Sequence, residues 1–197
     1  AGADVLTYEG NIANGSMVGP KYFKEYVLAY ERRIIKAIRE SGIPRKEIFL
    51  TTKVWNSDQG YSSTKDAFKR SLDKLKTDYA DLYLVHWPVK GKYKDTWRAI
   101  EELYSEGLIK AVGVSNFHIH HLEDLMKSAE IKPMVNQYEF HPFLQQKPLL
   151  EFCKKNGIIP EAWGPLTQGN RLDDEVLKSI AGKHGKSAAG ILLRWDF

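Results

Sequence analysis

Short apolar runs of β type alternate with helical patterns through most of the chain. Five such runs occur at 48–54, 81–87, 110–116, 134–140 and 158–163. Apolar residues at three- and four-residue spacing predict helices between the runs, at 64–75, 94–106, 119–128 and 147–156. Two more predicted helices follow the last run, at 174–184 and 187–195. The pattern therefore predicts a repeated unit of one strand and one helix.

A repeat of strand and helix requires a parallel sheet, because each helix returns the chain to the same end of the sheet. A closed (β/α)8 barrel and an open, doubly wound sheet both meet this requirement. Neither G-x-G-x-x-G nor G-x-x-x-x-G-K, the phosphate loops of open nucleotide-binding sheets, occurs in the sequence. Polar or aromatic residues instead end every predicted strand, which is typical of a barrel active site. We therefore predict an α/β fold of the (β/α)8 TIM-barrel type.

The beginning of the chain follows this pattern less well. Residues 1–9 have room for one short strand, and the stretch 10–20 is rich in glycine and asparagine, which predicts a loop. An apolar stripe at helical spacing then runs from Tyr22 to Ile38, and Gly42 is placed to end that helix. We expect a single domain over 1–197 whose first 35 residues are irregular.

Composition narrows the class of protein. The 197 residues, 43% of them hydrophobic, can bury a sizeable core. The net charge is only +4 and the charged side chains are interspersed, so nothing indicates a nucleic-acid or membrane-surface partner. No apolar run approaches the roughly 20 residues of a membrane span. The single Cys153 excludes an intramolecular disulfide, which suits a reducing compartment. We expect a cytoplasmic monomer.

The stretch Asp81–Pro88, DLYLVHWP, delivers a histidine to the end of a predicted strand. Its apolar residues are of buried β type, and Pro88 lacks the N–H that would continue a strand ladder. His86 therefore lies where parallel α/β folds collect their active-site loops. From this octapeptide alone, a core histidine beside a core tryptophan is the favoured interpretation. The residues at the ends of the other predicted strands favour a functional role for His86 instead.

Five motifs at these strand ends resemble those of one enzyme family. They are TTKVWNSDQGY at 51–61, LVHWP at 84–88, GVSNF at 113–117, VNQYEFHP at 135–142 and EAWGPL at 161–166. Their order is similar to that in aldo-keto reductases, which are NADPH-dependent (β/α)8-barrel enzymes. The resemblance covers 36–196 and is greatest to microbial and protozoan members, including those described as prostaglandin F synthases and 2,5-diketogluconate reductases.

The resemblance implies reduction of an aldehyde or ketone to an alcohol by hydride transfer, with a tyrosine hydroxyl giving a proton to the oxygen. Lys53 matches the catalytic lysine, whose cation lowers the pKa of that phenol from its ordinary value of about 10. His86 matches the histidine that orients the carbonyl and donates to the developing oxyanion. Trp55 and Trp87 match aromatic walls of the pocket for a small carbonyl substrate.

The resemblance also implies a cofactor, NADPH or NADP+, and the residues that hold it. Ser115, Asn116 and Gln137 would hydrogen-bond the carboxamide of the nicotinamide, and Trp163 would stack on its ring. The turn that follows would lie along the diphosphate, through Gly164, Pro165 and Leu166. The family more often has serine at position 164.

The catalytic tyrosine and its aspartate have only a loose match. The family carries D-T-A-x-x-Y-G-N-E ahead of the helix that here reads KAIRESG. Asp4 and Tyr8 give the nearest match, with the spacing one residue short, and Tyr30 is the second choice. Phe197 precedes the position of the family's eighth strand, which belongs to the segment that holds the 2′-phosphate of the cofactor. The alternative hypothesis is therefore a catalytically silent or truncated barrel relative with a binding role only.

Two groups of histidines raise the question of a metal. Glu139 and His141 resemble a carboxylate and histidine pair, but no third ligand lies close in the sequence. His118, His120 and His121 begin a predicted helix, where we expect them to face solvent. We predict no metal site.

Overall fold

A sheet of five parallel strands carries the fold in the computed structural model, which describes residues 36–37 and 40–196. The strands lie side by side in the order of the sequence. They are β1 (Thr51–Val54), β2 (Ala80–Val85), β3 (Ile109–Ser115), β4 (Val135–Glu139) and β5 (Ile159–Trp163). Each corresponds to one of the apolar runs, so the predicted parallel α/β arrangement is confirmed.

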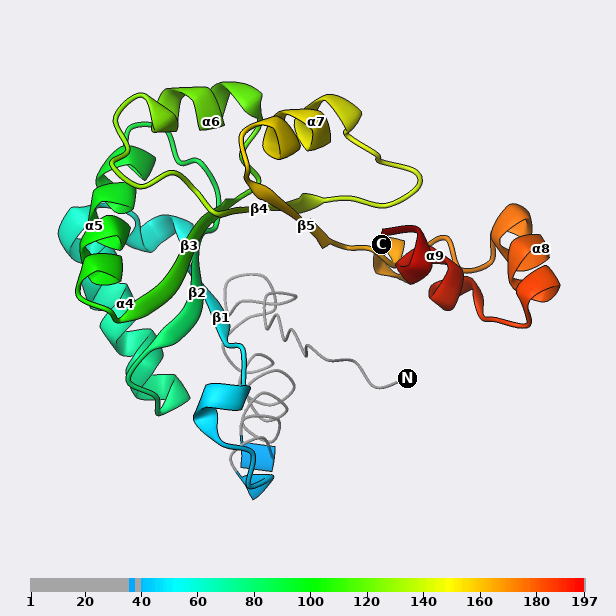
Figure 1. Ribbon diagram of the computed structural model, residues 1–197, viewed down its shortest axis with the longest axis horizontal. Coiled ribbons are helices and arrows are strands. Elements are labelled where there is room, and N and C mark those ends of the chain that lie inside the picture. The colour runs from blue at the N-terminus through cyan, green and yellow to red at the C-terminus, as the bar shows by residue number, and fades with distance from the viewer. Residues whose placement is uncertain (1–35, 38–39, 197) are drawn as a thin grey trace.

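Helices connect successive strands and follow the last one. Figure 1 shows the four connecting helices along the outer side of the curved sheet, while the two last helices lie beyond β5. The connecting helices are α4 (Tyr61–Leu75), α5 (Tyr93–Ser105), α6 (Ile119–Met126) and α7 (Lys147–Lys155), and the last two are α8 (Glu175–His184) and α9 (Ala188–Asp196). Short 3-10 turns occur at η3 (Arg45–Glu47), η4 (Asn56–Asp58) and η5 (Thr167–Gly169). All six predicted helices of this region are present.

The first strand is shorter than its apolar run predicts. It begins at Thr51, and side chains bind backbone groups of two of the preceding residues. Arg45 Nη1 donates to the carbonyl of Ile48 at 2.7 Å. The N–H of Leu50 donates to the carboxylate of Asp81 at 2.8 Å. The hydrophobicity of residues 48–50 does not predict which groups their backbone N–H and C=O will bind.

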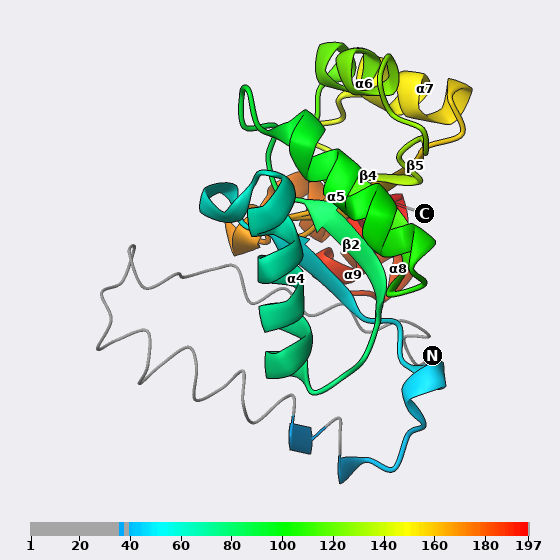
Figure 2. The same ribbon diagram turned by 90° about the vertical axis from the view of Figure 1, so that its left-hand side faces the viewer.

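The outward face of the sheet forms the main core with the connecting helices. Tyr83 and Val85 of β2 and Val112 of β3 alternate onto this face and are fully buried. Figure 2 shows α4 and α5 covering the strands on that side. Trp97 of α5 is 1% exposed, and its indole N–H donates to the carbonyl of Ile131 at 3.0 Å. This bond satisfies the one polar group that the indole brings into the core.

The inward face of the sheet is concave. Lys53 of β1 and Gln137 of β4 bind each other across it, Nζ to Oε1, at 2.5 Å. On a flat sheet, β1 and β4 would lie about 14 Å apart with their side chains standing parallel. The contact therefore requires the sheet to curl toward this face, as a barrel wall does.

Leucine and glycine line the floor of the concave face. Leu82, Leu84 and Val135 form a small apolar cluster there. Gly113 of β3 lies between Leu84 and Val135, its partners in the ladder. A Cβ at Gly113 would come within 2.7 Å of both Leu84 Cδ2 and the carbonyl oxygen of Val135. Glycine thus allows three neighbouring strands to approach one another closely.

The cap of α8 offers a local test of the fold. Asp174 Oδ1 accepts from the N–H groups of Val176 at 3.0 Å and Leu177 at 3.2 Å. We expect Asp174→Ala to lower the free energy of unfolding by about 1 kcal/mol, since two helix N–H groups lose their acceptor. Urea denaturation measures this change. Asp174→Asn keeps the acceptor and is the control, so an equal loss in both variants would contradict a capping role.

Several predictions fall outside the described residues. They concern Asp4, Tyr8 and Tyr30, the early strand, the loop at 10–20 and most of the helical stripe that follows. At the end of that stripe, Gly42 has a φ of 74°, the left-handed conformation that its predicted place at a helix end requires. None of the helices in the described part of the chain is long and apolar enough to cross a membrane.

Candidate functional site

The carboxyl ends of the five strands lie at one edge of the sheet and bring the predicted site residues together. In the ladder, Val54 pairs with Val85, Ser115 with Gln137 and Glu139 with Trp163. This register aligns the ends of neighbouring strands, so polar side chains far apart in the sequence become neighbours. They are Lys53, His86, Ser115, Asn116, Gln137 and Trp163.

A first chain of hydrogen bonds joins β2, β3 and β5 and is centred on Asn116. Its Nδ2 donates to the carbonyl of His86 at 2.9 Å and to the hydroxyl of Ser115 at 3.1 Å. Its Oδ1 accepts from the indole N–H of Trp163 at 2.7 Å. Asn116 has a φ of 63°, a left-handed conformation that asparagine adopts more readily than most residues. These bonds fix the direction of the Trp163 indole.

A second chain joins β1, β4 and β5 across the concave face. Lys53 Nζ donates to Gln137 Oε1 at 2.5 Å, and Gln137 Nε2 donates to Glu161 Oε1 at 2.7 Å. Gln137 is 1% exposed, so both bonds are shielded from competing water. The amide thus lies between an ammonium and a carboxylate.

His86 lies at the rim of the concave face beside two tryptophans. It is 9% exposed, and its ring centroid is 4.7 Å from that of Trp55, with the planes inclined at 60°. Trp55 and Trp87 are 38% and 44% exposed, so each presents much of its ring to solvent. Gln59 Nε2 donates to the carbonyl of Trp87 at 2.7 Å and holds this loop. The Trp55 and His86 rings thus pack against each other at the ends of β1 and β2, and Trp87 follows His86 directly in the sequence.

The turn after β5 departs from ordinary backbone conformations. Gly164 has a φ of 67°, and its carbonyl accepts from the N–H of Thr167 at 2.8 Å. Thr167 and Gln168 also have positive φ, of 53° and 54°, which is rare for a β-branched residue such as threonine. Backbone strain of this kind is concentrated at functional sites. Pro165 and Leu166 lie inside this turn.

A profile of the Aldo/keto reductase family matches residues 18–197. The chain belongs to the aldo-keto reductase family. Glyoxal reductase from Bacillus subtilis (strain 168) is 64% identical over 159 residues, which are 81% of this chain and 58% of that protein. The 9,11-endoperoxide prostaglandin H2 reductase of Trypanosoma cruzi (strain CL Brener) is 53% identical over 174 residues, 87% of this chain and 62% of that protein.

Solved structures of aldo-keto reductases share the fold. The crystal structure of a Gox0644 variant in complex with NADPH is 44% identical, with a TM-score of 0.76 over 82% of this chain and 59% of that one. This chain therefore spans about 60% of the length of the relatives it matches. The predicted family and the α/β barrel class are both confirmed, and the five described strands form part of such a barrel.

Sequence reasoning missed two residues of this aldo-keto reductase site. Glu161 lies within the EAWGPL motif, where the resemblance implies no role for it, although a carboxylate in the middle of a predicted strand itself indicates a polar partner. Thr167 was missed because nothing in its residue type predicts a positive φ. The roles of the other site residues stay predictions, since geometry alone does not assign a step to a side chain.

The histidines at the start of α6 form a separate cluster. His120 Nε2 lies 3.0 Å from His121 Nε2, and the N–H of His118 donates to His121 Nδ1 at 3.2 Å. Burial lowers the pKa of His121, and repulsion from His120 and His118 lowers it further. His118 and His120 are exposed, whereas His121 is half-buried.

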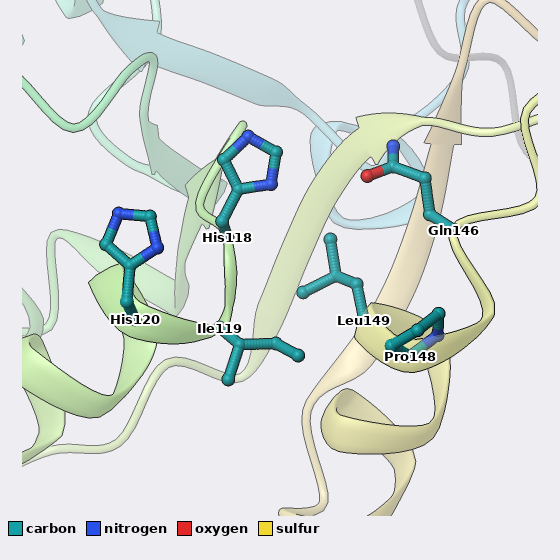
Figure 3. A pocket seen from close by; sticks show the side chains of 6 residues that line it. All are labelled: His118, Ile119, His120, Gln146, Pro148 and Leu149. Carbon is teal, nitrogen blue, oxygen red and sulfur yellow. The ribbon is translucent and has the colours of Figure 1, made fainter.

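Figure 3 shows a hollow of about 380 Å³ beside this cluster, between the first turns of α6 and α7. His118 and His120 lie on one side of it, and Gln146, Pro148 and Leu149 on the other. None of the strand-end residues of the site lines it. Across residues 36–37 and 40–196, no three histidine, cysteine or acidic side chains are grouped to hold a metal. His141 Nε2 lies 3.5 Å from Glu139 Oε1.

Proposed function

We propose that this aldo-keto reductase reduces a small aldehyde or ketone to an alcohol with NADPH. The observation that supports this most is the convergence of Lys53, His86 and Trp163 at one end of a parallel sheet that matches the family. An ammonium, an imidazole and an indole there can serve a reaction that develops negative charge on an oxygen beside a flat ring.

The residues present fit a nicotinamide cofactor. Ser115 and Gln137 are buried polar side chains at neighbouring strand ends, suited to a carboxamide. Trp163 offers a ring whose direction Asn116 fixes. Gly164 has no Cβ and lies in a left-handed turn, which leaves backbone open to a diphosphate. When bound, NADPH would supply the hydride.

The remaining chemistry falls to side chains of the chain itself. The proposed role of His86 is to donate a ring N–H to the carbonyl oxygen as negative charge develops there. Lys53 would favour the ionised form of the tyrosine that gives up its proton, for which Tyr8 is the first candidate, with Asp4 beside it, and Tyr30 the second. Trp55 and Trp87 would bound the substrate.

The names of the relatives favour small dicarbonyl substrates. Relatives are named glyoxal reductase and methylglyoxal reductase, the second from Salmonella typhimurium at 42% identity. The prostaglandin H2 reductase shares 53% identity, less than the glyoxal reductase at 64%. We therefore propose glyoxal and methylglyoxal as the first substrates to assay, with prostaglandin H2 as the comparison.

Titration with NADPH tests this proposal. The chain has five tryptophans, and a nicotinamide stacked on Trp163 should quench its share of the fluorescence. We expect saturable quenching that Trp163→Phe reduces strongly. Trp195→Phe is the control, because Trp195 contacts Phe140, with ring centroids 5.1 Å apart, and lies on α9 outside the site. Absence of quenching up to millimolar NADPH, together with no turnover of glyoxal, would favour a catalytically silent relative.

A further inference from the structure

Glu161 is a carboxylate at the site for which the proposed reaction has no use. It lies on β5 directly opposite Gln137 in the parallel ladder, so both side chains point to the concave face. The residue is half-buried, where a carboxylate needs a partner. Its carboxylate oxygen Oε1 accepts from the amide nitrogen Nε2 of Gln137 at 2.7 Å.

The two neighbours of Gln137 allow its amide only one orientation. The oxygen accepts from the ammonium of Lys53, and the nitrogen donates to the carboxylate of Glu161. With the amide reversed, its NH2 group would face the ammonium and its oxygen would face the carboxylate. Both contacts would then be repulsive in a buried place, where unpaired polar groups cost most.

Within the described part of the chain, the Gln137 amide makes one side-chain hydrogen bond at each end, which leaves one further position at each end. An amide oxygen has two lone pairs and an amide nitrogen has two hydrogens. Lys53 uses one lone pair and Glu161 uses one hydrogen. The remaining acceptor on the Gln137 oxygen and the remaining donor on its nitrogen can pair with a second primary carboxamide. That carboxamide must place its nitrogen against the Gln137 oxygen and its oxygen against the Gln137 nitrogen.

We propose that Glu161 is a positioning residue that, by orienting Gln137, sets which way round the nicotinamide carboxamide of NADPH binds. This inference rests on the proposed function, because it requires the nicotinamide to reach Gln137. The direction of the carboxamide decides whether its nitrogen meets the Gln137 oxygen and its oxygen meets the Gln137 nitrogen, so that both hydrogen bonds can form. Glu161 thus acts without touching either the substrate or the reacting atoms.

Two substitutions separate orientation from charge. Glu161→Ala removes the acceptor, so the amide of Gln137 can turn. Glu161→Gln removes the charge but keeps an oxygen that can accept from Gln137 Nε2. We expect Glu161→Ala to raise the NADPH dissociation constant and lower kcat about tenfold each, the effect of losing one bond to a charged group. We expect Glu161→Gln to stay within about threefold of the parent protein in both. Equal damage in the two variants would overturn the proposal.

Hydrogen exchange of the Gln137 side-chain amide tests the orientation without any turnover. Its NMR signals are identified by their loss in Gln137→Leu. The Nε2 hydrogen bound to Glu161 should exchange slowly in the parent protein and in Glu161→Gln, and at least tenfold faster in Glu161→Ala. The control is Glu151→Ala, an exposed position of α7, which should leave exchange and NADPH binding unchanged.

The two measurements can reject the proposed function and the positioning role of Glu161 independently of each other. Slow exchange that depends on Glu161, in a protein that binds no NADPH, would reject the proposed function and leave the orientation of Gln137 intact. Fast exchange in the parent protein, or NADPH binding that is insensitive to Glu161→Ala, would reject the positioning role. Circular dichroism of each variant shows whether a loss comes from unfolding.

Discussion

Lys53→Met should lower kcat for glyoxal reduction by about 10² to 10⁴-fold, the usual range for losing general acid–base assistance. Methionine is close to lysine in length but carries no charge, so the concave face keeps most of its packing and loses the ammonium together with its bond to Gln137. Without that cation the phenol would lose its means of lowering its pKa, and proton transfer would slow. The loss of NADPH absorbance at saturating glyoxal measures kcat directly.

The control for this substitution is Lys110→Met. Lys110 is an exposed residue of β3, at the end of the strand away from the site, with its Nζ 5.3 Å from the ring centroid of Tyr79. Its replacement removes the same charge from the protein and should leave kcat unchanged. Equal activity of Lys53→Met and the parent protein would contradict the catalytic role of Lys53.

Gly113→Ala should lower the free energy of unfolding by about 1 to 3 kcal/mol, the range for overpacking a filled core. The added Cβ would lie 2.7 Å from a backbone oxygen of β4, which cannot move without displacing the strand. A rotation of the Leu84 side chain relieves only one of the two collisions. The midpoint and slope of urea denaturation give the loss.

Gly182→Ala is the matched control. Gly182 lies within α8, and a Cβ there would meet nothing within 4 Å. Alanine is favoured over glycine in a helix by about 1 kcal/mol, so this variant should be as stable as the parent or more so. A loss of stability as large as that of Gly113→Ala would show that glycine replacement itself, and not the close approach of strands, is responsible.

The periodic pattern predicts the order and type of the described helices and strands, because the spacing of buried apolar residues differs between a helix and a strand. Tyr83 and Val85 must face the helices, and the run that carries them can be recognised without knowing its neighbours. The start of β1 is predicted less well, because Asp81 binds the N–H of Leu50 from a distant part of the chain. The single domain, the monomeric state and the cytoplasmic location stay predictions.

The sequence predicts those site residues that lie at the carboxyl ends of strands. His86 and Gln137 follow from their places at the ends of apolar runs, and the family resemblance supplies their expected roles. Pairing within the site does not follow, because it depends on the register of β4 against β5 and on the curvature that brings Lys53 to Gln137. The hydrogen bond between Glu161 and Gln137 follows only from that register.

Both hydrogen-bond chains end on β5, two positions apart, at Glu161 and Trp163. For protein engineering, this makes β5 the segment to leave unchanged when substrate range is altered. Substitutions at Trp55 or Trp87 change exposed aromatic side chains that take part in neither series of hydrogen bonds. A library confined to those two positions would therefore vary the pocket while the residues proposed for chemistry keep their partners.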